Sequence, residues 1–128
     1  MKINVEFAGN KKVYAHINNF VVKTDQPTNV GGDNTAPSPF ELFLASIATC
    51  AGIYVKMFCD SRNISSENIV ITQNVEFKDN GLPSKISINI KLPTDFPDKY
   101  KESIIKVAEN CKVKQSIISQ PVFEIALS

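Results

Sequence analysis

The sequence predicts an α+β fold, and three patterns in it support this prediction. Apolar and polar residues alternate over residues 3–22 and again over residues 69–92, as in half-buried antiparallel strands. Between these regions, residues 42–55 contain no charged side chain, which is typical of a core helix. Residues 98–111 carry apolar side chains at helical spacing. The predicted order is three strands, a core helix, a hairpin, an amphipathic helix and a last strand.

The first third of the chain predicts an antiparallel meander of three strands, at residues 3–7, 13–17 and 20–22. Gly-Asn and Asn-Asn turn signals separate the strands, and the alternating apolar residues are expected to form a half-buried face. Residues 25–37 are almost all turn formers, so they predict a long loop.

A helix is predicted to begin at Ser38-Pro39 and to continue to about Ser61. Ser38 and Glu41 have the spacing of a capping box, and proline at the first helical position fits its fixed φ. The uncharged stretch of residues 42–55 is shorter than the roughly twenty residues that are needed to cross a bilayer. We therefore expect a helix that is buried on nearly every side, not a membrane anchor.

The second half of the chain predicts a hairpin, two helical segments and a strand. The hairpin strands are expected over residues 68–78 and 86–92, with the turn at Asp79-Asn80-Gly81. An amphipathic helix begins at Asp98, and a shorter helical stretch covers residues 112–119. A last strand is expected from Pro121 onward, because apolar residues alternate there again up to Leu127.

The composition is that of one ordinary globular domain, which we place over residues 1–128. The 14 Lys and Arg residues nearly balance the 13 Asp and Glu residues, which argues against a nucleic-acid partner. No apolar leader segment opens the chain, so we expect a cytoplasmic protein without a secretory signal. Three cysteines, an odd number, argue against a disulfide scaffold and for a reducing compartment. The single histidine, His16, excludes a multi-histidine metal site and is expected to be an ordinary strand residue.

The three cysteines are the remaining candidates for chemistry. Cys50 lies in the middle of the core helix, where a cysteine most often acts as a small buried hydrophobe. Cys59 follows on the opposite side of that helix, about 13 Å along the axis, so these two cannot form a disulfide. Cys111 lies at a helix junction beside Lys112 and Lys114, and both features favour the thiolate. Cys50 and Cys111 can act as a redox couple only if the fold brings them together.

Residues 32–50, GDNTAPSPFELFLASIATC, resemble the signature helix of the OsmC/Ohr family (osmotically inducible protein C and organic hydroperoxide resistance proteins). In that family a helix opened by proline carries a cysteine eleven positions later, as Pro39 and Cys50 do here. The second family cysteine follows an amphipathic helix and opens a short helical turn, which matches Cys111. The form Ala-Pro-Ser-Pro-x-Glu is most similar to the less characterised OsmC-like branch.

This resemblance implies an OsmC-like fold, in which an antiparallel sheet wraps around two helices and two chains form an intertwined homodimer. It also implies a thiol-dependent, peroxiredoxin-like peroxidase of the oxidative stress response, with Cys50 and Cys111 as the catalytic residues. Cys50 attacks the hydroperoxide and becomes a sulfenic acid, Cys111 resolves it as a disulfide, and an external dithiol reduces that disulfide. No metal or organic cofactor is needed. The apolar surroundings of Cys50 favour organic or fatty-acid hydroperoxides over hydrogen peroxide.

Two positions depart from the Ohr-type pattern. Phe40 stands where those enzymes have a glutamate directly after the proline, and Glu41 is one residue further on. Those enzymes also use an arginine from the early strands, whereas the only arginine here is Arg62, beyond the core helix. The positive charge can come instead from a lysine of the early strands, and the candidates are Lys11, Lys12 and Lys23.

These departures leave two alternatives to a peroxidase open. In the first, the chain is a non-catalytic OsmC-fold dimer that binds an apolar small molecule or a partner, and its cysteines are merely packed. In the second, the protein is a thiol redox sensor whose oxidation changes a contact with a partner. The missing arginine and glutamate favour the first alternative, whereas the paired placement of Cys50 and Cys111 favours the enzyme.

Overall fold

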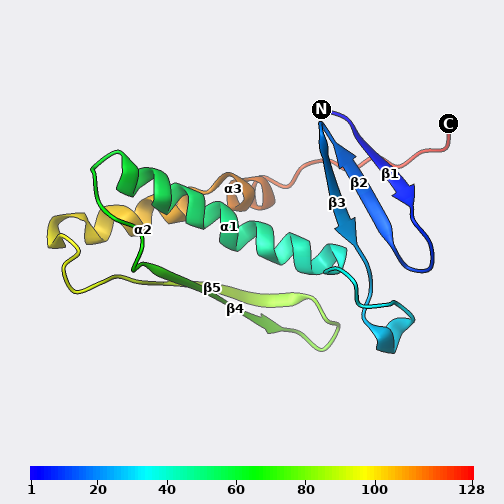
Figure 1. Ribbon diagram of the computed structural model, residues 1–128, viewed down its shortest axis with the longest axis horizontal. Coiled ribbons are helices and arrows are strands. Elements are labelled where there is room, and N and C mark those ends of the chain that lie inside the picture. Colours follow the sequence, from blue (N-terminus) through cyan, green and yellow to red (C-terminus); the bar gives the residue numbers. More distant parts are fainter. The chain divides into compact units, whose positions relative to one another are not determined.

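The chain opens with an antiparallel meander of three strands, as the sequence predicted (Figure 1). In the computed structural model, which describes all residues 1–128, these strands are β1 (Ile3–Phe7), β2 (Val13–Ile17) and β3 (Phe20–Thr24). Gly9 and Asn10 both adopt positive φ in the turn between β1 and β2. Glycine and asparagine are the residues that tolerate this conformation best, which is why the sequence signal was reliable here.

Two compact units make up the chain, Met1–Ala45 and Ser46–Ser128. The long helix α1 (Pro39–Asp60) begins in the first unit and continues into the second. The first unit holds the meander and the loop that leads into α1. The second unit holds the rest of the helices and a β-hairpin.

The apolar face of the meander is not half-buried, contrary to the prediction for the first strand. Ile3, Val5 and Phe7 of β1 are 52%, 60% and 87% exposed. A three-stranded sheet buries its apolar face only when a second layer packs on it, and the first unit supplies no such layer. The face is therefore free to be covered from outside the unit.

The loop of residues 25–37 is organised around the fully buried carboxylate of Asp25. Its Oδ1 accepts hydrogen bonds from the backbone N–H groups of Gln26 and Asp33, at 2.7 and 3.4 Å. Its Oδ2 accepts from the hydroxyl and the backbone N–H of Thr35, at 2.6 and 3.0 Å. These hydrogen bonds, that of the Thr35 hydroxyl above all, hold the pKa of Asp25 well below its usual range. Gly32 packs so closely that a Cβ there would lie 1.9 Å from the carbonyl oxygen of Gln26.

Helix α1 begins with the predicted capping box. The Ser38 backbone N–H donates to the Glu41 carboxylate at 2.7 Å, and the Glu41 backbone N–H donates to the Ser38 hydroxyl at 3.2 Å. The helix ends at Asp60, so the predicted end near residue 61 is also confirmed. Since no proline interrupts it, the helix runs unbroken through both Cys50 and Cys59.

The predicted burial of α1 on nearly every side is wrong. The buried residues form one stripe at helical spacing, Ile47, Ala51, Val55, Phe58 and Cys59. Apolar residues off the stripe are exposed, and Ile53 and Met57 are 51% and 61% exposed. One chain of this size covers only one side of a 22-residue helix. By length and composition alone α1 is the one helix that can cross a membrane, a test that the core helix of a globular protein also passes.

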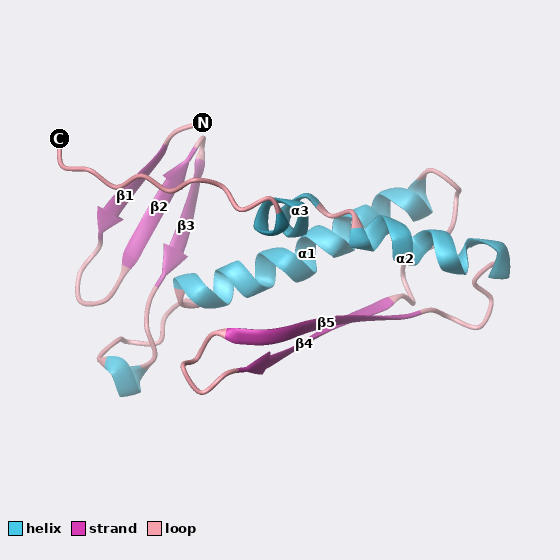
Figure 2. Cartoon of the chain, turned by 180° about the vertical axis from the view of Figure 1, so that it is seen from behind, coloured by secondary structure: helices cyan, strands magenta, loops and turns pink.

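In the second unit, strands β4 (Val70–Phe77) and β5 (Pro83–Lys91) form the predicted antiparallel hairpin. The Leu82 backbone N–H donates to the Asn80 side chain at 3.1 Å in its turn, and Gly81 has a φ of 80°. A short 3₁₀ turn η2 (Asp98–Tyr100) leads into α2 (Lys101–Glu109), which is followed by α3 (Lys112–Ile118). Figure 2 shows α1 and α2 on one side of the hairpin. The predicted α+β class is thereby confirmed.

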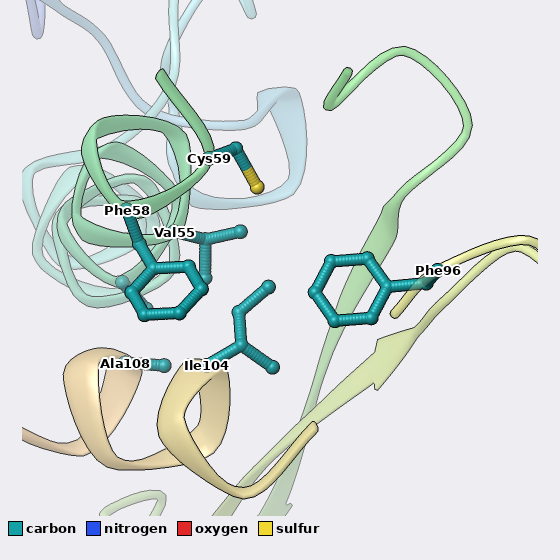
Figure 3. Packing of buried hydrophobic residues seen from close by; sticks show 7 residues of the cluster. Val55, Phe58, Cys59, Phe96, Ile104 and Ala108 are labelled. Atoms are coloured by element: carbon teal, nitrogen blue, oxygen red, sulfur yellow. The ribbon is translucent and has the colours of Figure 1, made fainter. Parts of the chain in front are cut away.

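The core of the second unit lies between α1, α2 and the hairpin. Figure 3 shows Ile104 of α2 pointing between Phe58 of α1 and Phe96. Ile104 is fully buried, and the cluster around it also includes Ala51, Val55, Cys59 and Ala108. Three isoleucines of the hairpin pack against this cluster, namely Ile71, Ile88 and Ile90, and so does Ile69, which directly precedes β4. The alternating pattern of the hairpin therefore directs its apolar face toward the helices, as expected.

The predicted last strand is wrong. Residues 120–128 form no helix or strand, and Val122, Phe123, Ile125 and Leu127 are 86% to 102% exposed. A strand requires a neighbouring strand for its backbone hydrogen bonds, and within the second unit only β4 and β5 are paired. The alternating pattern of the segment thus lacks a partner in this chain.

Candidate functional site

A cavity of about 610 Å³ opens in the second unit, between the hairpin, α1, α2 and α3. Most of its wall is isoleucine: Ile47 comes from α1, Ile105 from α2, and the others from β5 and α3, namely Ile86, Ile88, Ile90, Ile117 and Ile118. Polar groups are few, and they are Asn89, Glu109, Cys111 and Lys114. A mainly apolar cavity of this size with a few polar groups is typical of a small-molecule site.

Cys111 is the thiol in the wall of this cavity. Its extended backbone, with φ of −62° and ψ of 140°, makes it the N-cap residue of α3. The Lys114 backbone N–H donates to the Cys111 sulfur at 3.4 Å. The sulfur thus caps the first turn of α3. The helix junction predicted for Cys111 is confirmed.

Lys114 contributes to the same cavity twice, through its backbone N–H and through its half-buried side chain. Its ammonium group forms no ion pair. Lys112, in contrast, is exposed and does not line the cavity. Of the two lysines that the sequence placed beside Cys111, Lys114 is therefore the one beside the cavity.

Cys50 lies on α1, half-buried and without a disulfide. It is not among the residues that line the cavity, but Ile47, three positions earlier, is. Three positions along a helix correspond to about 60° around its axis, so Cys50 lies on the flank of the buried stripe, next to the cavity-lining side. The fold thus places Cys50 and Cys111 in the same unit, on elements that border one cavity.

Cys59 belongs to the core and not to the cavity. Its side chain is fully buried among apolar residues, and this burial raises the pKa of the Cys59 thiol. Because α1 is continuous, the separation from Cys50 is that of nine helical residues, as the sequence predicted. Of the three cysteines, Cys59 is the one that belongs to the apolar core cluster.

The supporting residues Glu41, Lys11 and Lys12 lie in the first unit, whereas both candidate cysteines lie in the second. The Glu41 carboxylate is occupied by the capping box. Lys12 forms an ion pair and a hydrogen bond with Asp33, which raises the pKa of Lys12, and Lys11 is exposed. A catalytic contribution of these residues stays a prediction.

Three further polar residues also have local roles. The His16 ring lies 2.6 Å from the Glu6 carboxylate on the neighbouring strand, which agrees with an ordinary strand histidine. Lys23 lies over the ring of Tyr14, 5.7 Å from its centroid. No three histidine, cysteine or acidic side chains come together as ligands for a metal ion.

The sequence pointed to the cysteines but not to the wall around them. Alternation in residues 86–90 shows that these isoleucines share a face, yet it does not show what lies opposite that face. The same is true of Glu109, which occupies the last position of α2 and borders the cavity. Both depend on how the helices pack on the hairpin, which is tertiary information.

Comparison with known structures supports the fold. A candidate osmotic stress induced and detoxification response protein from Psychrobacter arcticus is 23% identical, with a TM-score of 0.75 over 91% of this chain and 87% of that one. An OsmC like protein from Mycoplasma pneumoniae is 14% identical, with a TM-score of 0.70 over 91% and 86% of the two chains. An organic hydroperoxide resistance protein OsmC from Legionella pneumophila is 21% identical, with a TM-score of 0.55 over 91% and 87%.

No curated protein is significantly similar to the chain in sequence. The sequence model of one protein family, described as OsmC-like protein, matches residues 32–126. This match covers most of the chain, including the signature helix, the hairpin and both candidate cysteines. The chain therefore belongs to the OsmC-like protein family.

Proposed function

We propose that this protein is a thiol-dependent peroxidase that reduces organic hydroperoxides, with Cys50 as the attacking thiol and Cys111 as the resolving thiol. One observation carries the proposal: Cys111 lines an apolar cavity that is bordered, through Ile47, by the helix face next to Cys50. The isoleucine wall suits a substrate with an alkyl or acyl chain, including fatty-acid hydroperoxides, better than it suits hydrogen peroxide.

The proposed reaction has three steps. The Cys50 thiolate attacks the outer oxygen of the hydroperoxide, so an S–O bond forms, the O–O bond breaks, and the alkoxide leaves as an alcohol after protonation. The Cys111 thiolate then attacks the sulfenic sulfur, so the S–S bond forms, the S–O bond breaks, and the hydroxide leaves as water after protonation. An external dithiol finally reduces the disulfide to two thiols and is itself oxidised to a disulfide.

Lys114 is our candidate for the positive charge that an arginine supplies in Ohr-type relatives. Its side chain borders the cavity without an ion-pair partner, and its backbone already contacts the Cys111 sulfur. A lysine is a point charge without the two-pronged geometry of arginine, so a slower turnover than in Ohr-type enzymes is expected. Lys11, Lys12 and Glu41 remain candidates for a supporting role.

We further propose that the full chain of residues 1–128 acts as one domain within a cytoplasmic homodimer. Three apolar surfaces are uncovered in the single chain: the β1 face, the outer side of α1 around Ile53, and the segment of residues 122–127. A second copy that covers these surfaces would account for all three. Sedimentation velocity at micromolar concentration tests this proposal, and a 14.1 kDa species would contradict it.

The main alternative is a binding protein that uses the same cavity without redox chemistry. It is favoured by the fact that Cys50 itself does not line the cavity. A redox sensor would use the same cysteines, but its oxidation would serve to change a contact with a partner and not to consume peroxide continuously.

Thiol mapping separates these functions. The protein is treated with cumene hydroperoxide, with a fatty-acid hydroperoxide and with hydrogen peroxide, and the remaining thiols are mapped by peptide mass spectrometry. We expect a Cys50–Cys111 disulfide in the wild type and no peroxide consumption by Cys50→Ser. Cys111→Ser should give a single turnover followed by over-oxidation of Cys50, and Cys59→Ala should behave like the wild type. Wild-type thiols that survive excess organic hydroperoxide would refute the enzyme and leave the binding protein.

A further inference from the structure

A second groove, of about 510 Å³, lies between the C-terminal half of α1 and α2. It shares no residue with the Cys111 cavity. On α2, Ile105 and Glu109 face the cavity, whereas Ser103, Lys106 and Val107 face the groove. At about 100° per residue, these two sets lie on opposite sides of the helix. The groove is therefore a separate site that the proposed thiol chemistry does not use.

Arg62, the only arginine of the chain, is held in place at one end of the groove. Its guanidinium carbon stacks 3.8 Å from the centroid of the Phe58 ring and 5.3 Å from that of Tyr100. Its Nη1 donates to the Ser61 hydroxyl at 2.8 Å and to the Phe58 carbonyl at 3.4 Å. The guanidinium is thus ordered before any ligand arrives, and N–H groups beyond these two bonds remain for one.

Lys106 brings a second positive charge into the groove from α2. Neither Arg62 nor Lys106 forms an ion pair, although neighbouring lysines do. Lys56 on α1 pairs with Asp60, and Lys101 on α2 pairs with Asp98. Glu102 lies four positions before Lys106, the spacing of a helical ion pair, but the two side chains are not paired.

The rest of the groove consists of hydroxyl and apolar groups, with no carboxylate. The Ser61 hydroxyl donates to the Phe58 carbonyl at 2.9 Å, so Ser103 is the hydroxyl that can donate a hydrogen bond to an anion in the groove. Met57 and Val107 offer an apolar wall, and Met57 is 61% exposed. Two unpaired cations, one available hydroxyl and an apolar wall together match a ligand with an anionic head and an apolar body.

We propose that this groove binds an organic phosphate monoester, with the phosphate between Arg62 and Lys106 and the organic group against Met57 and Val107. A phosphate dianion matches two positive charges, and arginine binds phosphate through two parallel N–H bonds. A carboxylate carries one charge and is expected to bind more weakly. The proposal does not depend on the peroxidase, because the groove contains no cysteine.

Titration of the full-length, ¹⁵N-labelled protein with phenyl phosphate tests the proposal. In low salt we expect the amide signals of Ser61, Ser103 and Val107 to shift together with one dissociation constant. Benzoate and inorganic phosphate are expected to bind at least fivefold more weakly. Benzoate carries one negative charge instead of two, and inorganic phosphate lacks the apolar group. Equal affinity of benzoate and phenyl phosphate would overturn the assignment to a phosphate monoester.

Charge-removing variants locate the site. Arg62→Met and Lys106→Met should each weaken phenyl phosphate at least tenfold, while Lys112→Met, which removes an exposed lysine outside the groove, should change the affinity less than twofold. Because Arg62→Met also removes the stacking on Phe58, Lys106→Met and Arg62→Lys are the variants that keep the test independent of folding. Equal weakening in Lys112→Met, or shifts confined to amides around Glu109, would refute the groove as the site.

Discussion

Truncation of Ile104 tests the packing that holds the candidate site together. Ile104 lies on α2 and is fully buried against α1 and Phe96, and Ile→Ala removes three carbon atoms from that position. At about 0.8 kcal/mol for each buried carbon, the lost transfer free energy is about 2.4 kcal/mol. The void that remains adds to this, so Ile104→Ala is expected to lower the free energy of unfolding by about 3–4 kcal/mol.

Ile105→Ala is the matched control, because Ile105 is the next residue on the same helix and is 53% exposed. About half of the transfer free energy therefore applies at this position, and the better helix propensity of alanine offsets part of it. The free energy of unfolding is expected to fall by about 0.7 kcal/mol. Urea unfolding at fixed protein concentration measures both variants. With a slope of about 1.5 kcal/mol/M, the midpoint falls by about 2 M for Ile104→Ala and about 0.5 M for Ile105→Ala. Equal shifts, or a loss below about 1 kcal/mol at Ile104, would refute the described core.

Three further changes have defined outcomes. Gly32→Ala should destabilise the protein by more than about 1 kcal/mol in thermal melts, whereas Gly52→Ala, which meets no atom closer than 4.0 Å, should stabilise it by about 0.5–1 kcal/mol. The pKa of Asp25 is lower in the folded than in the unfolded state, so this carboxylate stabilises the fold above about pH 4 and the stabilisation is lost as the pH falls further. In acid titrations, the free energy of unfolding of Asp25→Asn should therefore fall less steeply below about pH 4 than that of the wild type. Cys59→Ser should keep peroxide consumption but lower stability by about 1–3 kcal/mol, since it places a hydroxyl in the apolar core, and an unchanged melting temperature would contradict that placement.

Local signals in the sequence were sufficient for most elements. The capping box at Ser38 and the Asn80-Gly81 turn are formed by neighbouring residues, so the information needed to predict them lies within a few positions. The position of Cys111 at a helix junction is of the same kind, because it follows from where α2 ends. The structure confirms all three features.

Features that depend on a partner surface were not predictable in this way. Alternation in residues 121–127 shows that a strand is possible, but whether it forms depends on a strand that pairs with it. The uncharged face of α1 likewise shows that burial is favourable, but not that this chain supplies the cover. Nor did residue spacing show that Lys114 and not Lys112 would border the cavity, since that depends on the rotation of α3 against the hairpin.

Helix α2 contributes to three different surfaces. Ile104 and Ala108 fill the core, Ile105 and Glu109 border the Cys111 cavity, and the groove takes most of the remaining side chains. Of its nine residues, only Glu102 lies outside these three surfaces and forms no ion pair. A saturation mutagenesis library should therefore tolerate substitutions far less on this short helix than on the longer α1, whose outer side is open. An insertion of one residue would rotate every side chain beyond it by about 100° and misplace each of these faces at once.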